Sequence, residues 1–214
     1  MIEHPFPYIT ELKNQTKIET IADLLFLQDI TFSIIPWKAK PYFDSIINRF
    51  ETFYTRCKSM EIGGWCGLNA EFLRILLTGY NIRCSAHNYG LVNHQFTHVV
   101  VKAEIDGMTF LLDPYFNRTY MYRDEFILQY YDILRFLNEK KLDRITSVFG
   151  TNKKPVIEDD GGIVYKTGPE FEKLIMSGFD AMGINKVMQD VFNATDLKLL
   201  ILLKIPTPPK EIQV

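Results

Sequence analysis

The pair Asp106-Gly107 is the feature that most constrains how this chain folds, because it stands between two runs of alternating apolar residues. Asp-Gly in that setting is a strong signal for a two-residue β-hairpin turn. Such a turn pairs Ile105 with Met108 and fixes the register of both strands. A one-residue slip would mix the two faces, so the register is well determined. In this register one face is entirely apolar and carries Val99, Val101, Ala103, Ile105, Met108, Phe110 and Leu112.

The other face of the predicted hairpin carries His98 and Asp113. Asp113 lies diagonal to His98, and diagonal Cβ atoms of an antiparallel pair are about 7–8 Å apart, near enough for an imidazole and a carboxylate to meet. Pro114 then ends the strand, because proline has no N–H to donate to a sheet. The sequence therefore predicts a His–Asp pair from the hairpin register.

Upstream of the hairpin, Gly63-Gly64-Trp65-Cys66 precedes a run with the apolar spacing of a helix that buries one stripe. Because the two glycines interrupt the preceding structure, we expect the helix to begin close to Cys66. The free N–H groups and the positive dipole end of a helix favour a thiolate at that position. Glycines without side chains would let a substrate backbone approach the sulfur. The apolar stripe consists of Leu68, Phe72, Leu73, Leu76, Leu77 and Tyr80.

A cysteine at a helix start, a histidine on a strand and an acid on the adjacent strand are the parts of a thiol nucleophile system. In this interpretation Cys66 attacks a carbonyl carbon, His98 takes up the thiol proton, and Asp113 holds the imidazole ring. The backbone N–H of Cys66 is the first expected oxyanion donor. Further substrate-binding or oxyanion candidates are Gly64, Trp65, Trp37 and Gln28.

These motifs together resemble the transglutaminase-like superfamily, a group of papain-related thiol enzymes. The resemblance rests on Gly-Trp-Cys-Gly-Leu-Asn-Ala-Glu-Phe-Leu, on Thr-His-Val-Val-Val and on Leu-Leu-Asp-Pro after the Asp-Gly turn, and it covers Gly63 to Tyr115. It implies an α+β fold in which N-terminal helices accompany a nucleophile helix packed on an antiparallel β-sheet. It also implies that Cys66, His98 and Asp113 occupy the catalytic positions.

Arylamine N-acetyltransferases are relatives of this group, and Gly63-Gly64-Trp65-Cys66 is similar to their Arg-Gly-Gly-x-Cys motif. Here Ile62 replaces the arginine, and Asp113 precedes proline rather than Val-Gly. Hydrolysis of an amide or peptide bond through a thioester is therefore the first functional hypothesis, with a peptide or protein as substrate. Acyl transfer to an amine is the enzymatic alternative. A catalytically inactive protein-interaction module is the non-enzymatic one.

Composition excludes some classes of function. A net charge of -2 over 214 residues gives no electrostatic drive toward nucleic acid or an anionic membrane. The three cysteines form no CxxC motif, which favours a reducing compartment and a cytoplasmic location. No signal peptide is apparent, and the late apolar run at 199–203 is too short to span a bilayer. No cofactor is indicated.

A zinc site is the main chemical alternative, because Cys84, His87, His94 and His98 lie close in the sequence. Cys84 and His87 fall on a predicted strand, where their side chains point to opposite faces. His94 and His98 would share a face only on a helix, and the local pattern is that of a strand. We therefore expect no metal, with Cys84 in the core and His87 and His94 at the surface or at a pocket rim.

The remaining sequence predicts a single domain over 1–214, with a core at about 40–120 and a mainly helical C-terminal extension at about 121–205. Glycine-rich and acidic residues between 150 and 168 are expected to form a loop. Helices are predicted at 11–28, 41–57, 124–142, 168–182 and 184–192, a strand at 82–89, and a strand or helix at 197–205.

Overall fold

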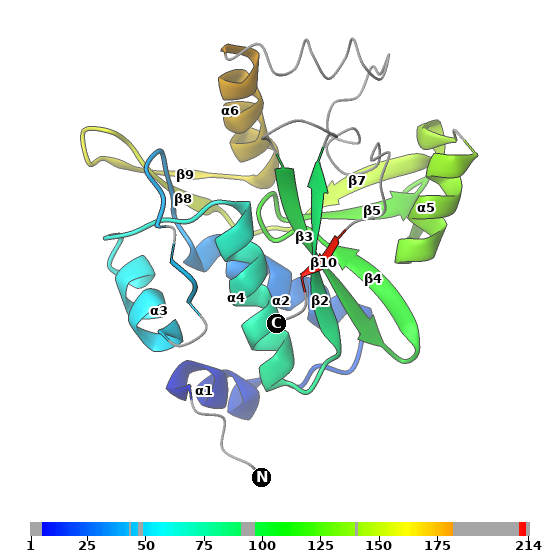
Figure 1. Ribbon diagram of the computed structural model, residues 1–214, viewed down its shortest axis with the longest axis horizontal. Coiled ribbons are helices and arrows are strands. Elements are labelled where there is room, and N and C mark those ends of the chain that lie inside the picture. Colours follow the sequence, from blue (N-terminus) through cyan, green and yellow to red (C-terminus); the bar gives the residue numbers. More distant parts are fainter. Residues whose placement is uncertain are drawn as a thin grey trace.

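The computed structural model has a mixed α+β fold and describes residues 6–42, 44–46, 49–90, 97–139, 141–181 and 210–212. Its central antiparallel sheet has the strand order β10-β2-β3-β4 (Figure 1). Three of these strands, β2, β3 and β4, come from the middle of the chain, and β10, the last described segment, pairs with β2. The strands are β2 (Cys84–Gly90), β3 (Thr97–Ile105), β4 (Met108–Leu112) and β10 (Lys210–Ile212).

The predicted hairpin is confirmed in its register. Ile105 pairs with Met108, and Val101 pairs with Leu112. Asp106 and Gly107 have φ angles of 50° and 72°, the left-handed conformation that a tight hairpin turn requires at both central residues. The turn therefore places His98 and Asp113 on one face of the sheet, as the sequence predicts.

Helix α4 (Cys66–Gly79) begins at the predicted cysteine and packs on the apolar face of β2 and β3. Trp65 is its N-cap residue. Apolar side chains of α4 meet those of the hairpin in the largest core cluster, where Phe72, Leu73, Leu76 and Leu77 lie with Val101, Ala103, Phe110 and Leu112. The expected packing of the cysteine helix on an antiparallel sheet is therefore present.

The opposite face of the hairpin is covered by a second layer, which lies on the far side of the sheet from α4 (Figure 1). Val100 and Leu111 point into this layer and pack there with Tyr120 and Ile133. The layer contains β5 (Arg118–Tyr122), β6 (Phe126–Ile127), β7 (Ile145–Phe149), α5 (Tyr130–Asn138) and the short 3-10 helix Leu142–Arg144. The described part of the extension after residue 121 therefore contains strands as well as helices, because aromatic and β-branched residues pair as strands there, and residues 182–205 lie outside the described ranges.

The predicted N-terminal helix at 11–28 is two helices. α1 (Pro7–Gln15) and α2 (Ile21–Ile34) are separated by an extended segment. Thr20 and Asp23 form a reciprocal capping box, in which each side chain accepts a hydrogen bond from the other residue's backbone N–H. This local signal starts a new helix where hydrophobic spacing alone suggests continuity.

Among the described residues of the helix predicted from Pro41 to Cys57, the helical part is α3 (Phe50–Lys58). The backbone N–H of Ile46, which a helix would direct to a carbonyl one turn earlier, donates instead to Glu71 Oε1 at 3.2 Å. The hydroxyl of Ser45 donates to the same oxygen at 2.6 Å. A carboxylate on α4 therefore holds this segment in a non-helical conformation.

Residues 150–168, expected to form a loop, contain the hairpin β8 (Lys154–Ile157) and β9 (Ile163–Lys166). The acidic residues form its turn, where Glu158 N donates to Gly162 O at 2.8 Å. β8 pairs in parallel with β1 (Trp37–Lys38). Helix α6 (Gly168–Ala181) begins at the predicted glycine. The elements predicted at 184–192 and 197–205 lie outside the described residues.

None of the helices in the described ranges is both long and apolar enough to cross a lipid bilayer.

The segment that leads into α4 is packed closely against the rest of the protein. Gly64 N donates to Pro36 O at 2.9 Å. A Cβ on Gly64 would lie 2.9 Å from Leu68 Cβ, whereas a Cβ on Gly67 would meet nothing within 4 Å. Glycine is therefore required at position 64 because the protein's own side chains fill the space that a Cβ would occupy, and that space is not left open for a substrate.

We expect Gly64→Ala to lower the free energy of unfolding by about 1–3 kcal/mol, because the added methyl group overpacks the start of α4. The matched control Gly67→Ala occupies open space and replaces a helical glycine, so its stability should be unchanged or about 0.5–1 kcal/mol higher. Urea unfolding followed by circular dichroism measures both. Equal stabilities of the two variants would contradict this account of Gly64.

Candidate active site

Cys66 stands at the first residue of α4 and is partly buried. Its side chain packs against an aromatic cluster between α4 and the C-terminal elements, to which Tyr115, Phe116 and Phe171 belong. The preceding residue, Trp65, is 44 % exposed. The thiol is therefore neither enclosed in the main core nor fully open to solvent, and an exposed aromatic side chain precedes it.

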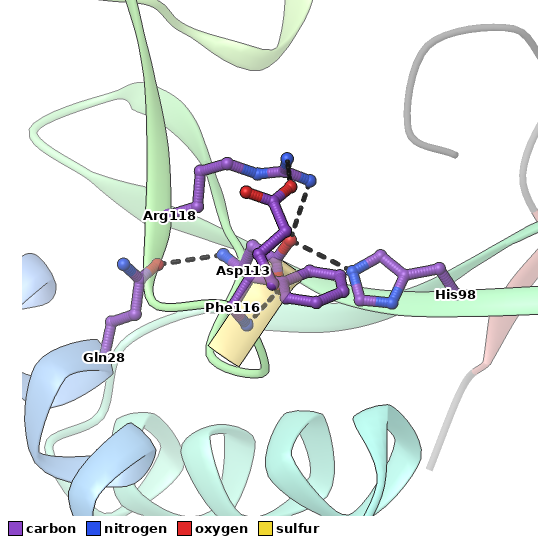
Figure 2. Close-up of polar contacts among 6 residues, drawn as sticks. Gln28, His98, Asp113, Phe116 and Arg118 are labelled. Carbon is purple, nitrogen blue, oxygen red and sulfur yellow. Dashed lines mark hydrogen bonds and ion pairs between the residues drawn. The ribbon is translucent and has the colours of Figure 1, made fainter. Parts of the chain in front are cut away.

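His98 and Asp113 make the contact that the hairpin register predicts. Nε2 of His98 lies 3.0 Å from Oδ2 of Asp113 (Figure 2). Both side chains are buried, at 5 % and 0 % exposure. The His98 ring also has a side-chain hydrogen bond with Cys66. Because Nε2 faces the carboxylate, Nδ1 is the ring nitrogen that remains for the sulfur. The structure thus brings Cys66, His98 and Asp113 together.

The loop after β4 holds Asp113 from several sides. Its backbone N–H donates to Gln28 Oε1 at 2.8 Å, and Phe116 N donates to its Oδ1 at 3.2 Å (Figure 2). Asp113 also forms an isolated β-bridge with Arg118. The carboxylate therefore has its position fixed through both its backbone and its oxygens.

The pair His98–Asp113 is strongly polarised. Burial disfavours the charged imidazole, but the Asp113 charge and hydrogen bonds to Asp113 and Cys66 outweigh burial and raise the pKa of His98 to about 9. Burial likewise disfavours the Asp113 carboxylate, yet His98 and Arg118 hold the pKa of Asp113 below its usual value. The geometry therefore favours an imidazolium–carboxylate pair at neutral pH.

Arg118 and Glu172 complete this polar cluster, and sequence reasoning missed both. Arg118 Nη2 lies 3.4 Å from Asp113 Oδ2, and Nη1 lies 2.8 Å from Glu172 Oε1. Glu172 is on α6, far from the hairpin in the sequence. The closeness of Arg118 to Asp113 is a weak local signal, whereas nothing in the sequence connects Glu172 with either residue.

Lys154 is a second buried basic side chain that the sequence analysis did not identify. Its Nζ donates to Asn69 Oδ1 at 2.7 Å and lies 4.8 Å from the centroid of the Phe32 ring. Asn69 Nδ2 in turn donates to the carbonyl of Trp65 at 2.8 Å. Burial lowers the pKa of Lys154 to about 7, although the Cys57 and Asp113 charges favour the cation. Lys154 thus helps to hold the backbone of Trp65, the residue before Cys66, through the side-chain amide of Asn69.

Three of the predicted substrate-binding or oxyanion candidates use their polar groups within the protein. Trp65 Nε1 donates to Lys38 O at 3.0 Å. The amide of Gln28 is buried behind Asp113, where Nε2 donates to Asn117 Oδ1 at 3.4 Å. Trp37 has a side-chain hydrogen bond with Tyr115. At Gly64, the fourth candidate, the space beside the Cα is filled by Leu68, as described above.

Tyr115 is a hydroxyl donor that the sequence analysis did not single out. It packs in the aromatic cluster that also contacts Cys66 and Trp37, and its ring centroid lies 6.0 Å from that of His98. Because the indole N–H of Trp37 donates to the Tyr115 oxygen, the hydroxyl proton must point elsewhere. Burial and the Cys66 charge raise the pKa of Tyr115 well above its usual value, so the hydroxyl keeps its proton.

The residues considered for zinc are separated in the structure. Cys84 Sγ contacts Thr78 Oγ1 at 3.8 Å, whereas His87 Nε2 lies 3.0 Å from Ser85 Oγ. His87 is 2 % exposed, so the expectation of a surface position is wrong; its ring packs beside Tyr130. Within the described ranges, no three His, Cys, Asp or Glu side chains form a group that could hold a metal ion. His94 lies outside those ranges.

Comparison with known proteins assigns no family to this chain. No protein-family profile matches the chain, and no curated protein matches it. A similar solved structure is described as "a Putative Cysteine Protease from Cytophaga hutchinsonii", with 19% sequence identity and a TM-score of 0.36. The similarity covers 52% of this chain and 39% of that chain, so it spans less than half of the neighbour's length. Values this low assign no activity to this chain.

The polarised pair predicts how stability depends on pH. The pKa of His98 is raised from about 6.5 in the unfolded chain to about 9 in the fold. Its contribution to stability is therefore fully present below about pH 6.5 and is lost as the pH rises through about 9. We expect the free energy of unfolding to fall, relative to His98→Gln, by about 1–3 kcal/mol between about pH 6 and pH 10.

Urea unfolding of the two proteins across that range measures this difference. Asp113 has the opposite sign, because its pKa is lowered. Its contribution is present above about pH 4 and is lost as the pH falls through its folded value. A constant difference between the wild type and His98→Gln up to about pH 10 would contradict the raised pKa of His98.

Proposed function

We propose that this protein is a thiol hydrolase of the transglutaminase-like type that cleaves an amide or peptide bond through a thioester on Cys66. The observation that carries the proposal is the His98 ring, which hydrogen-bonds both the Cys66 side chain and the buried carboxylate of Asp113. Cys66 supplies the sulfur at a helix N-terminus, where backbone N–H groups face outward. These are the parts that nucleophilic acyl chemistry requires.

In the proposed reaction, Cys66 Sγ attacks the carbonyl carbon, and the proton that the thiol has given up is held by His98. The tetrahedral intermediate collapses as His98 returns the proton to the leaving amine, which leaves a thioester on Cys66. A water molecule, deprotonated by His98, then attacks the thioester and releases the acid and the free thiol. Asp113 stays ionised throughout and holds the imidazole in the orientation that both steps need.

Two donors are proposed for the oxyanion. The first is the backbone N–H of Cys66, which is preorganised at the start of α4. The second is the hydroxyl of Tyr115, whose oxygen is engaged by Trp37 and whose proton therefore points away from the indole. The partly exposed ring of Trp65 is proposed as a contact for an apolar part of a peptide or protein substrate.

Trapping of the thioester is the direct test. An activated ester such as p-nitrophenyl acetate should add one acyl group to Cys66, which intact-mass spectrometry detects and peptide mapping locates. Cys84 is the matched control thiol, because it is also partly buried but contacts Thr78 rather than a histidine. Acylation of Cys84 at the same rate as Cys66, or of neither, would contradict the proposed function.

We expect Cys66→Ala and His98→Ala each to reduce turnover on any true substrate by about 10³-fold or more, because the two groups act as a unit. Asp113→Asn should cost less, since the nucleophile and base remain, although the imidazole loses its ionised partner. Steady-state hydrolysis of a peptide amide that the wild type cleaves measures all three. Turnover that persists in Cys66→Ala would exclude a thioester mechanism.

Tyr115→Phe keeps the ring packing against Phe171 and His98 and removes only the hydroxyl. We expect kcat to fall by about 10²–10³-fold with little change in KM, the cost of losing one oxyanion donor. Alkylation of Cys66 by iodoacetamide forms no oxyanion and should be unchanged. Trp37→Phe is the paired variant; a large loss there, together with full activity in Tyr115→Phe, would assign the donor to the indole instead.

A further inference from the structure

The carboxylate of Asp113 is one end of a buried chain of alternating charges that leads away from Cys66. Arg118 lies next, with Nη2 at 3.4 Å from Asp113 Oδ2, and Glu172 follows, with Oε1 at 2.8 Å from Arg118 Nη1. The Arg118 side chain is fully buried and that of Glu172 is 1 % exposed. Apolar residues of similar volume often stabilise a protein as well as a buried ion pair does. Stability alone therefore does not explain why charged rather than apolar side chains occupy these buried positions.

Two cationic side chains share one oxygen of Asp113. Oδ2 contacts Nε2 of His98 at 3.0 Å and Nη2 of Arg118 at 3.4 Å (Figure 2). The guanidinium thus helps to hold the carboxylate in place, but its charge also opposes protonation of the His98 ring. The carboxylate of Glu172 offsets part of that charge from the other side of the guanidinium.

The position of Arg118 is fixed by more than its ion pairs. Its guanidinium carbon lies 5.3 Å from the ring centroid of Phe116 and 5.3 Å from that of Tyr120. The backbone of Arg118 is bridged to Asp113, since Arg118 N donates to Asp113 O at 3.1 Å. These contacts hold the guanidinium beside the carboxylate, as an electrostatic role requires.

We propose that Arg118 and Glu172 are positioning residues that extend the Cys66–His98–Asp113 arrangement, in which Arg118 fixes the carboxylate and Glu172 sets how much of the Arg118 charge reaches the imidazole. Glu172 lies on α6 and His98 on β3, so a helix of the C-terminal half governs the protonation of a ring in the central sheet. Neither Arg118 nor Glu172 is assigned a contact with substrate. Only the consequence for catalysis rests on the proposed function.

Other ionisable groups interact with His98 or Asp113 among the described residues, and they belong to four different parts of the fold. They are unchanged in the variants compared below, so a difference in titration between those variants reports the charges of Arg118 and Glu172. These groups are the thiol of Cys66 on α4, Tyr115 after β4, Tyr120 on β5 and Lys154 on β8.

The pKa of His98 can be measured directly by NMR of the full-length protein with ¹⁵N-labelled histidine, because the chain has only 4 histidines. Glu172→Gln removes a negative charge at nearly constant volume, so the pKa of His98 should fall by about 1. Arg118→Gln removes the opposing positive charge and should raise it by about the same amount. The control Glu61→Gln disrupts the exposed Arg56–Glu61 pair and should leave the titration unchanged.

Shifts of opposite sign in the two variants support the inference. No shift in Glu172→Gln, or shifts of the same sign, would overturn it. If Arg118→Gln does not fold, the double variant Arg118→Met with Glu172→Met takes its place, because it leaves no lone buried charge. The pKa of His98 in that protein should stay close to the wild-type value, and a fall as large as that in Glu172→Gln would refute the role of Glu172.

The same variants connect the titration with catalysis. In Glu172→Gln, the alkaline limb of the pH profile for ester acylation of Cys66 should move to lower pH together with the pKa of His98, while KM stays the same. A profile that does not follow the titration overturns the catalytic consequence. A wild-type protein that forms no thioester contradicts the proposed function instead, and the NMR result then still decides the electrostatic roles of Arg118 and Glu172.

Discussion

Burial of the Asp113 carboxylate is the constraint on which the rest of this site depends. An ionised carboxylate removed from water is very unfavourable unless charges and hydrogen bonds compensate it. Here His98 and Arg118 supply the charges, and Phe116 N donates a hydrogen bond to the carboxylate. The need to compensate one buried charge therefore ties strand β3, the loop after β4 and strand β5 together at a single point.

This constraint extends through the fold. Arg118 is itself buried and is balanced by Glu172, which brings α6 against the same point. Gln28 on α2 accepts from the backbone N–H of Asp113 and so links an N-terminal helix to it. Elements from the beginning, middle and later part of the chain thus converge on one carboxylate, and their convergence leaves the His98 ring facing Cys66.

The nucleophile side is organised by a separate set of contacts. Gly64 packs on Leu68 and donates to Pro36 O, and Asn69 holds the Trp65 carbonyl while it accepts a hydrogen bond from buried Lys154. These interactions fix the turn that precedes α4. The two halves of the site meet at the aromatic cluster of Tyr115 and Phe116, which packs against Cys66, and at the His98 ring, which connects the sulfur with the buried charge network.

The sequence by itself determined the hairpin, its register and the start of the cysteine helix, because each of these depends on neighbouring residues. Asp106-Gly107 selects the turn, alternation selects the face, and Gly63-Gly64 delimits the helix at Cys66. From these local rules the contact between His98 and Asp113 followed before any tertiary information. The capping box at Thr20 was equally local, although hydrophobic spacing concealed it.

Only the tertiary structure decided which distant groups surround that pair. Arg118, Glu172 and Lys154 have no motif in common with Asp113, and charged residues are ordinarily expected at the surface. The loop predicted between residues 150 and 168 became β8 and β9 because β8 finds the backbone partners that a strand requires in β9 on one side and in Trp37 and Lys38 on the other. Side chains from separate segments meet only after the layers pack, and a pattern read along the chain carries no information about such meetings.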